Sequence, residues 1–97
     1  SVEAWYNRGV ALAALGEYYR AIATYDKVLT LDAANANALT GRGLAWVKLE
    51  DYAAATADLE AALALNPEDA LAQETLTALA TAPTEAIVST PPPPPIF

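Results

Sequence analysis

Cysteine, methionine and histidine are absent from the sequence. Their absence excludes zinc fingers, disulfide staples and catalysis by a cysteine or histidine nucleophile, because each needs a thiolate or an imidazole. Serine occurs only at Ser1 and Ser89, and no glycine-rich phosphate-binding loop is present, so no catalytic set can be assembled. We therefore expect a protein that is not an enzyme and that needs no cofactor.

Positive charge is also scarce, with 5 lysine and arginine residues against 12 aspartates and glutamates and a net charge of −7. Every charge beyond Lys48 is negative. Such a surface repels a phosphate backbone and an anionic membrane, so neither nucleic acid nor a membrane is an expected partner. The longest uncharged stretch, residues 86–97, is too short and too rich in proline to span a membrane.

The acidic residues show no spacing that suits a metal ion. Residues 32–37 faintly resemble a calcium-binding loop, but they depart from the alternating pattern of such loops and lack the distal glutamate. The other acids are interpreted as solvated faces and helix-start charges: Glu50, Asp51, Asp58, Glu60, Glu68 and Asp69. No metal site is expected.

Alanine, in contrast, makes up about a quarter of the 97 residues. Alanine favours helices and is depleted in strands, and a chain that is 55% hydrophobic is too apolar to remain disordered. The length suffices for one domain and not for two. These features predict a single all-α domain.

The chain repeats itself after 34 residues. The shift superimposes Ala4 on Ala38, Arg8-Gly9 on Arg42-Gly43, Tyr18 on Tyr52, Ala21 on Ala55, Leu29 on Leu63 and Leu31 on Leu65. Chance matches among alanines do not explain the paired arginines, glycines and tyrosines. Apolar residues within each unit follow helical spacing, so each unit is predicted to be a pair of helices.

The turn inside each unit has its own prediction. In the first unit a helix over about residues 2–15 is expected to end at Gly16, which adopts a left-handed backbone at little cost. In the second unit Glu50 and Asp51 replace that glycine, so this connection is expected to be more strained. Small residues, Gly9 with Ala21 and then Gly43 with Ala55, are expected to let the paired helices approach closely.

A fifth helix is predicted after the second unit. Asn66 is a good N-cap and Pro67 suits the first helical position. The helix is expected to end at about residue 81, before Pro83.

Both units carry related residues at the positions of a known signature. In the first unit these are Trp5, Arg8, Gly9, Leu12, Ala21, Tyr25 and Ala33, and in the second Leu39, Arg42, Gly43, Trp46, Ala55, Leu59 and Pro67. The pattern resembles the tetratricopeptide repeat, a 34-residue helix–turn–helix unit. The sequence departs from the family pattern at Arg8 and Arg42, where the family has leucine, and at Ala33, where it has proline.

The resemblance implies a right-handed helical solenoid of two helix–turn–helix repeats, at about residues 2–35 and 36–69, with a C-terminal capping helix at about 67–81. The repeat domain would then occupy residues 1–82, and residues 83–97 would form a proline-rich tail. The resemblance also implies a non-catalytic interaction module whose partner is a protein or a peptide.

By the same resemblance, the first helices of successive repeats line a concave groove for an extended peptide. The expected peptide-binding residues are Tyr6, Asn7, Val10, Asn37, Thr40, Leu44, Val47 and Lys48. The alternative is that these residues only pack neighbouring helices together. Family members that hold a C-terminal carboxylate do so with basic residues, and no such clamp can be assembled here. The acidic tails of heat-shock chaperones are therefore not expected ligands.

Two arginines fall on a face that is expected to be largely buried, Arg8 and Arg42. A buried guanidinium needs a carboxylate partner, and we expect Arg42 to pair with Asp26. The alternative is a stem packed on the helix pair with its head in water.

The sequence ends in five prolines followed by Ile96 and Phe97. Five prolines form a polyproline II rod of about 16 Å, a shape that docks into aromatic-lined grooves. The residues expected to dock are Pro93, Pro94, Pro95, Ile96 and Phe97, on a repeat surface of a neighbouring chain near Tyr6 or the Tyr18-Tyr19 pair. The alternative is a disordered linker.

Two repeats also leave hydrophobic flanks exposed, and no cap precedes Trp5. The alternative to peptide binding is therefore a structural self-association domain, with homo-oligomers formed through the tail or the N-terminal flank. Neither a signal peptide nor an initiator methionine is recognisable, so the sequence is expected to be a processed or excised piece of a longer protein. The expected location is the cytoplasm.

Overall fold

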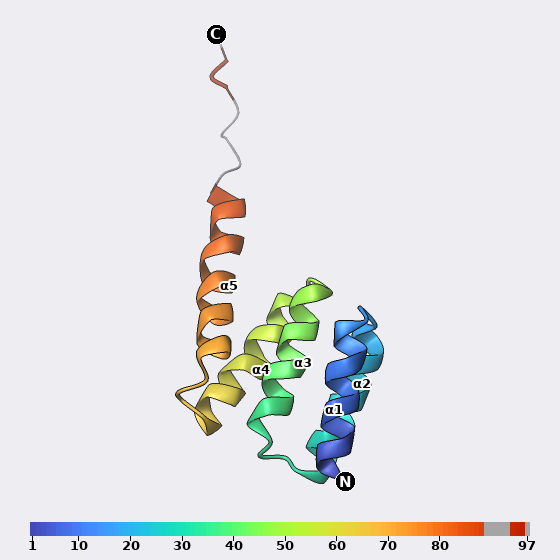
Figure 1. Ribbon diagram of the computed structural model, residues 1–97. Helices are drawn as coiled ribbons and strands as arrows, with labels where there is room; N and C mark the ends of the chain where they lie inside the picture. Colours follow the sequence, from blue (N-terminus) through green and yellow to red (C-terminus); the bar gives the residue numbers. More distant parts are fainter. Residues whose placement is uncertain (89–93, 97) are drawn as a thin grey trace.

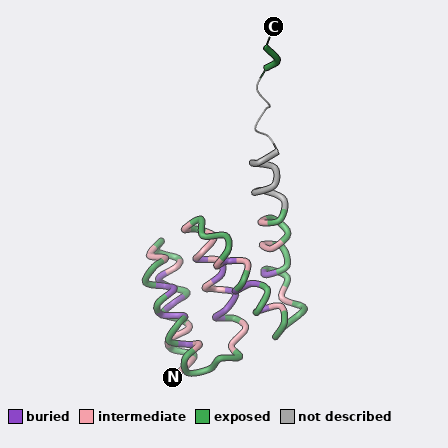
Figure 2. The backbone as a smooth tube through the Cα atoms, turned by 180° about the vertical axis from the view of Figure 1, so that it is seen from behind, coloured by how far each residue is buried: buried purple, intermediate pink, exposed green. Residues whose placement is uncertain are grey.

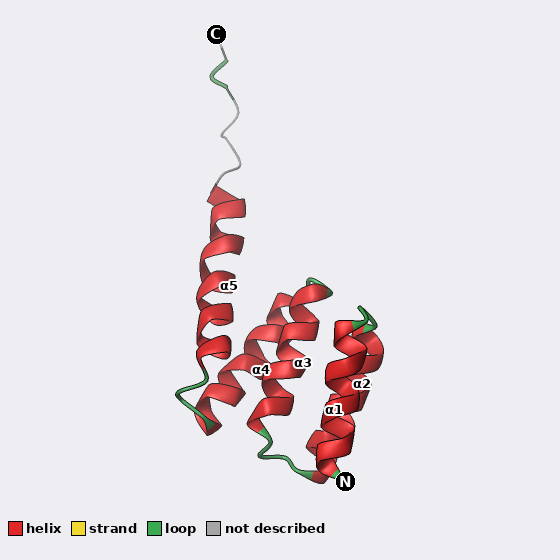
Figure 3. Ribbon diagram, viewed as in Figure 1, coloured by secondary structure: helices red, strands yellow, loops and turns green. Residues whose placement is uncertain are grey.

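The computed structural model describes residues 1–88 and 94–96, the side chains of residues 81–88 excepted. Within these residues the chain forms five helices and no strand (Figure 1, Figure 3). The helices are α1 (Val2–Ala14), α2 (Tyr18–Leu31), α3 (Ala36–Lys48), α4 (Tyr52–Leu65) and α5 (Ala70–Val88). The all-α prediction is confirmed.

Side-chain caps fix where α1, α3 and α4 begin. The capping oxygens and the amides that they accept from are Ser1 and Ala4 at 3.2 Å, Asn35 and Ala38 at 3.0 Å, and Asp51 and Ala54 at 3.2 Å. Each cap satisfies a backbone N–H that has no partner within its own helix.

The turns after α1 and α3 have the same form. Their left-handed residues are Gly16, at φ 81°, and Glu50, at φ 62°. In each turn the following amide donates back into the helix, to the carbonyl of Leu12 at 2.9 Å and to that of Trp46 at 3.0 Å. A side chain disfavours this backbone region, so the expected strain of the second turn is confirmed and lies at Glu50.

The helices stack as two antiparallel pairs followed by α5. α1 packs on α2 and α3 on α4, while α2 contacts α3 and α4 contacts α5 (Figure 1). The buried backbone lies between the helices of the pairs (Figure 2), where Tyr25, Val28 and Leu59 are at most 2% exposed. The successive pairs produce the predicted solenoid and bring α1 and α3 onto one face.

Small residues allow this close packing. A Cβ atom added at Gly43 would lie 2.9 Å from Leu59 Cγ and 3.3 Å from the Ala55 carbonyl oxygen. The predicted approach of α3 and α4 through Gly43 and Ala55 is therefore confirmed. At Gly9 the added atom would lie 2.7 Å from Tyr25 Cε1, so the close neighbour there is a tyrosine ring rather than the predicted alanine.

α5 differs from its prediction at both ends. Its first turn is capped by Asp69, whose Oδ1 accepts from the Ala72 amide at 3.0 Å, whereas Asn66 is the C-cap residue of α4. The helix continues through Pro83 to Val88, so the predicted end at residue 81 is wrong and the expected domain boundary falls inside α5. Proline fixes φ near the helical value, and it removes one hydrogen bond without having to end the helix.

Candidate functional site

A groove of about 450 Å³ lies on the face that α1 and α3 share. Its apolar lining consists of Tyr6, Val10, Ala13, Ala14, Tyr18, Tyr25, Gly41, Leu44, Ala45 and Leu71. Its polar lining consists of Asn37, Thr40, Lys48 and Asp69. The groove therefore offers a mainly apolar surface with polar groups at intervals.

Most of the predicted peptide-binding residues come together in this groove. Tyr6, Val10, Asn37, Thr40, Leu44 and Lys48 line it. Asn7 and Val47 do not, although each is the sequence neighbour of a residue that does. One step along a helix turns a side chain by about 100°, which takes both residues off the groove.

The contribution of α2 was missed, and its main element is Tyr25. The Tyr25 ring fits between Gly9 of α1 and Gly41 of α3, where added Cβ atoms would lie 2.7 and 2.6 Å from it. Its centroid lies 6.0 Å from that of Tyr6, with the planes tilted by 47°. Burial, with a smaller contribution from Tyr6, raises the pKa of Tyr25 to about 12. The sequence signal for the Tyr25 ring was Gly41, a glycine at a groove-facing position of α3.

The hydroxyl of Thr40 is held by Asp69. Thr40 Oγ1 donates to Asp69 Oδ2 at 2.6 Å, and the other oxygen of that carboxylate caps α5. The Thr40 hydrogen bond, with the cap second, lowers the pKa of Asp69 below its ordinary value. The interpretation of Asp69 as a helix-start charge is confirmed by its cap on α5, whereas its bond to Thr40, which ties α3 to the start of α5, was not predicted.

The expected pairing of Arg42 with Asp26 is confirmed, but it is only half of the arrangement. Arg42 Nη1 lies 2.6 Å from Asp26 Oδ1, and the guanidinium also makes two bonds to Asp58 of α4, from Nε at 2.8 Å and from Nη2 at 2.7 Å. Asp58 had been interpreted as solvated, yet the residue is only 7% exposed. The hydrogen bonds to Asp58, followed by those to Asp26, raise the pKa of Arg42. Arg42 therefore links α2, α3 and α4.

The sequence profile of the tetratricopeptide repeat family matches residues 17–80, which is more than half of the chain. The chain belongs to the tetratricopeptide repeat family.

A solved structure agrees with this assignment. The first TPR of Spaghetti (RPAP3), bound to the HSP90 peptide SRMEEVD, superimposes with a TM-score of 0.83 at 24% sequence identity. The match covers 87% of this chain and 67% of that chain. It shows that the two proteins share the tetratricopeptide repeat fold.

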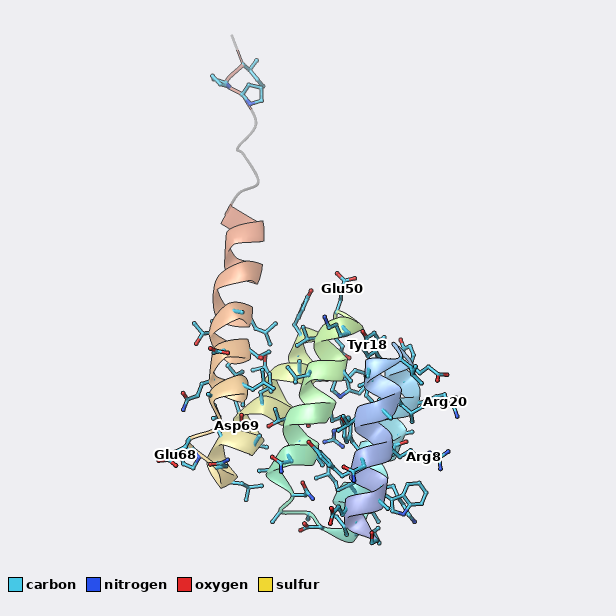
Figure 4. All side chains as sticks on the ribbon, viewed as in Figure 1. Arg8, Tyr18, Arg20, Glu50, Glu68 and Asp69 are labelled. Carbon is cyan, nitrogen blue, oxygen red and sulfur yellow. The ribbon has the colours of Figure 1, made fainter. Side chains whose placement is uncertain are left out.

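Arg8 occupies the same repeat position as Arg42 but behaves differently. It is exposed rather than buried, and it projects from the outer side of the molecule (Figure 4). Its Cζ atom lies 5.7 Å from the centroid of Trp5, and Lys27 Nζ lies 5.8 Å from the same ring. The residue equivalent to Asp58 in the first repeat is Thr24, so Arg8 has no carboxylate there and packs beside an aromatic face instead.

The residues expected to dock from the tail are only partly within the described chain. Pro94, Pro95 and Ile96 are exposed, Ile96 to 99%, and do not pack against the repeats of their own chain. Pro93 and Phe97 lie outside the described residues. Docking on a neighbouring chain stays a prediction.

Two further observations concern residues 1–88 and 94–96 alone. In that part of the chain no three acidic side chains gather closely enough to hold a metal ion. None of its helices combines the length and the apolar character needed to cross a bilayer.

Proposed function

We propose that this chain is a non-catalytic protein-interaction module that binds an extended peptide segment in the groove between α1 and α3. The observation that carries the proposal is the groove of about 450 Å³ whose apolar lining stays accessible to solvent. Val10 is 44% exposed and Leu71 is 51% exposed. Residues that served only to pack neighbouring helices would be buried, whereas an exposed apolar patch favours a binding surface.

The polar lining suits the backbone of such a segment. Asn37 is exposed, and its amide supplies both a donor and an acceptor to peptide groups. Among the described residues the Tyr25 hydroxyl makes no hydrogen bond. Every fully buried side-chain polar atom in that part of the chain has a partner, so the Tyr25 hydroxyl is not fully buried. The hydroxyl at the floor of the groove is thus free to bond a ligand.

The charge of the groove favours an apolar ligand over an acidic one. The structural relative binds SRMEEVD, which is rich in glutamate and aspartate. Among the residues that the structure describes, Lys48 is the one cation that lines the groove, Asp69 lies in the same groove, and the net charge of the chain is −7. An acidic tail would therefore meet net repulsion, and the ligand that we propose is apolar with few charges.

A pair of matched substitutions tests the proposal. Peptides selected from a random displayed library are titrated against the full chain by fluorescence anisotropy. We expect Val10→Glu to weaken binding at least about tenfold, because it places a charge in the apolar lining. Leu31→Glu is the control, since Leu31 is 51% exposed and lies outside the groove.

Thermal unfolding separates binding from packing. Binding predicts that Val10→Glu and Leu31→Glu melt within a few degrees of the parent chain while only the first loses affinity. A large fall in the melting temperature of Val10→Glu alone, or affinity equal to that of the control, would contradict the proposal.

A further inference from the structure

The groove and the tail have complementary shapes. Two half-buried tyrosines line the groove, Tyr6 and Tyr18, and proline rings pack well on aromatic faces. From Asn37 to Lys48 the groove runs along α3 for about 16 Å, at 1.5 Å per residue. The five prolines span about 16 Å as a polyproline II rod, and this rod has little ordering entropy left to lose.

The charge of the tail also suits the groove. Residues 86–97 carry no ionisable side chain, so placing their side chains in the groove buries no charged side chain and brings no acidic side chain near Asp69. Beyond the prolines, Ile96 and Phe97 offer apolar side chains to the remaining lining. Ile96 is 99% exposed in the single chain, so its apolar surface is still unpaired.

The direction of α5 assigns the tail to a second molecule. Under the repeat shift the position equivalent to Lys48 is residue 82, and α5 extends six residues further, to Val88, or about 9 Å. α5 runs in the same direction as α3 and extends past its C-terminal end (Figure 1), so the helix ends beyond the groove of its own chain. Two copies that exchange tails would close a symmetric pair.

We propose that the groove of one molecule binds residues 91–97 of a second copy of this chain. The inference rests on the proposed function, because it names the occupant of the same groove. Both molecules carry a charge of −7, so their repulsion opposes association and is screened by salt. Self-association should therefore strengthen as the salt concentration rises.

Sedimentation of the full chain tests the proposal. We expect the mass to rise from one copy toward two between about 10 µM and about 1 mM, the range of a single short apolar segment. Val10→Glu in the groove and the double change Ile96→Ser with Phe97→Ser in the tail should each weaken the association at least about tenfold. Leu31→Glu, outside the groove, should leave it unchanged.

Mixing the two defective proteins provides the decisive measurement. The groove variant keeps its tail and the tail variant keeps its groove, so an equimolar mixture should form a mixed pair, through one tail–groove contact instead of two, that neither protein forms alone. A parent chain that stays monomeric up to about 1 mM overturns the proposal, as does an association that Val10→Glu leaves intact. A mixture that stays monomeric likewise excludes exchange between copies.

The same variants distinguish this inference from the proposed function. If the tail variant binds library peptides and the parent chain does not self-associate, the groove binds peptides but the tail is not its ligand. If Val10→Glu leaves library peptides bound with parental affinity, the groove itself is wrongly assigned.

Discussion

The Arg42 guanidinium meets the Asp58 carboxylate through two hydrogen bonds, at 2.8 and 2.7 Å. The Asp58 side chain is 10% exposed, whereas that of Asp26, which accepts a third bond from the same guanidinium, is 55% exposed. The contact with Asp58 is therefore largely dehydrated, whereas the contact with Asp26 is hydrated. Removing a partner from a dehydrated pair leaves a buried charge without compensation, whereas a hydrated pair contributes little.

We therefore expect Asp58→Asn to lower the free energy of unfolding by about 3 kcal/mol, because it removes the dehydrated carboxylate that takes two of the three Arg42 hydrogen bonds and leaves that charge only its hydrated contact with Asp26. Asp26→Asn is the matched control and should cost less than about 1 kcal/mol. Urea denaturation of both variants measures the difference. Equal losses would show that burial does not govern the two contacts.

The left-handed turns provide a second prediction. Glu50 adopts a backbone conformation that glycine holds without strain, so Glu50→Gly should raise the free energy of unfolding by about 1 kcal/mol. Gly16→Ala makes the opposite change in the equivalent turn and should lower it by a similar amount. Thermal melts of the two variants should move in opposite directions, and shifts of the same sign would refute the account.

Gly41 is expected to tolerate no side chain. Alanine improves helix propensity by about 1 kcal/mol, but its Cβ would lie 2.6 Å from Tyr25 Cζ, and Gly9 blocks the other side of the ring. The clash should outweigh the gain in helix propensity, so Gly41→Ala should lower the free energy of unfolding by about 1–3 kcal/mol. A double-mutant cycle with Tyr25→Leu measures the coupling, and additive effects would show that the ring moves aside.

The link between Thr40 and Asp69 predicts a dependence on pH. The pKa of Asp69 is lower in the folded chain than in the unfolded one, so this carboxylate stabilises the fold above about pH 4 and the contribution is lost as the pH falls further. Thr40→Val removes the donor that contributes most to the shift. We expect the Asp69 titration midpoint to rise in a carbon-13 NMR titration. An unchanged midpoint would assign the shift to the helix cap instead.

Features that depend on local or periodic patterns were predictable. The repeat of Arg-Gly and tyrosine positions after 34 residues gave both helix pairs, and Gly16 gave the turn between the first two helices. The same repeat brought most of the groove residues onto one face, because equivalent positions on α1 and α3 point in the same direction.

Contacts between elements far apart in the sequence were harder to predict from the sequence. Asp58 looks like any exposed acid until α4 is placed against Arg42, and Asp69 acquires its role only when α5 begins beside Thr40. Tyr25 belongs to a second helix, so periodicity assigned it to the core and not to the floor of the groove. The predicted end of α5 was wrong because a proline in a helix interior removes one hydrogen bond and can kink the helix without ending it.

The passage of α5 through Pro83 has a consequence for engineering. A helix of 19 residues is about 28 Å long, so its length and direction set where the segment that follows it begins. Deleting a single residue from its distal half would shorten the helix by only about 1.5 Å but swing the attached segment by about 100°.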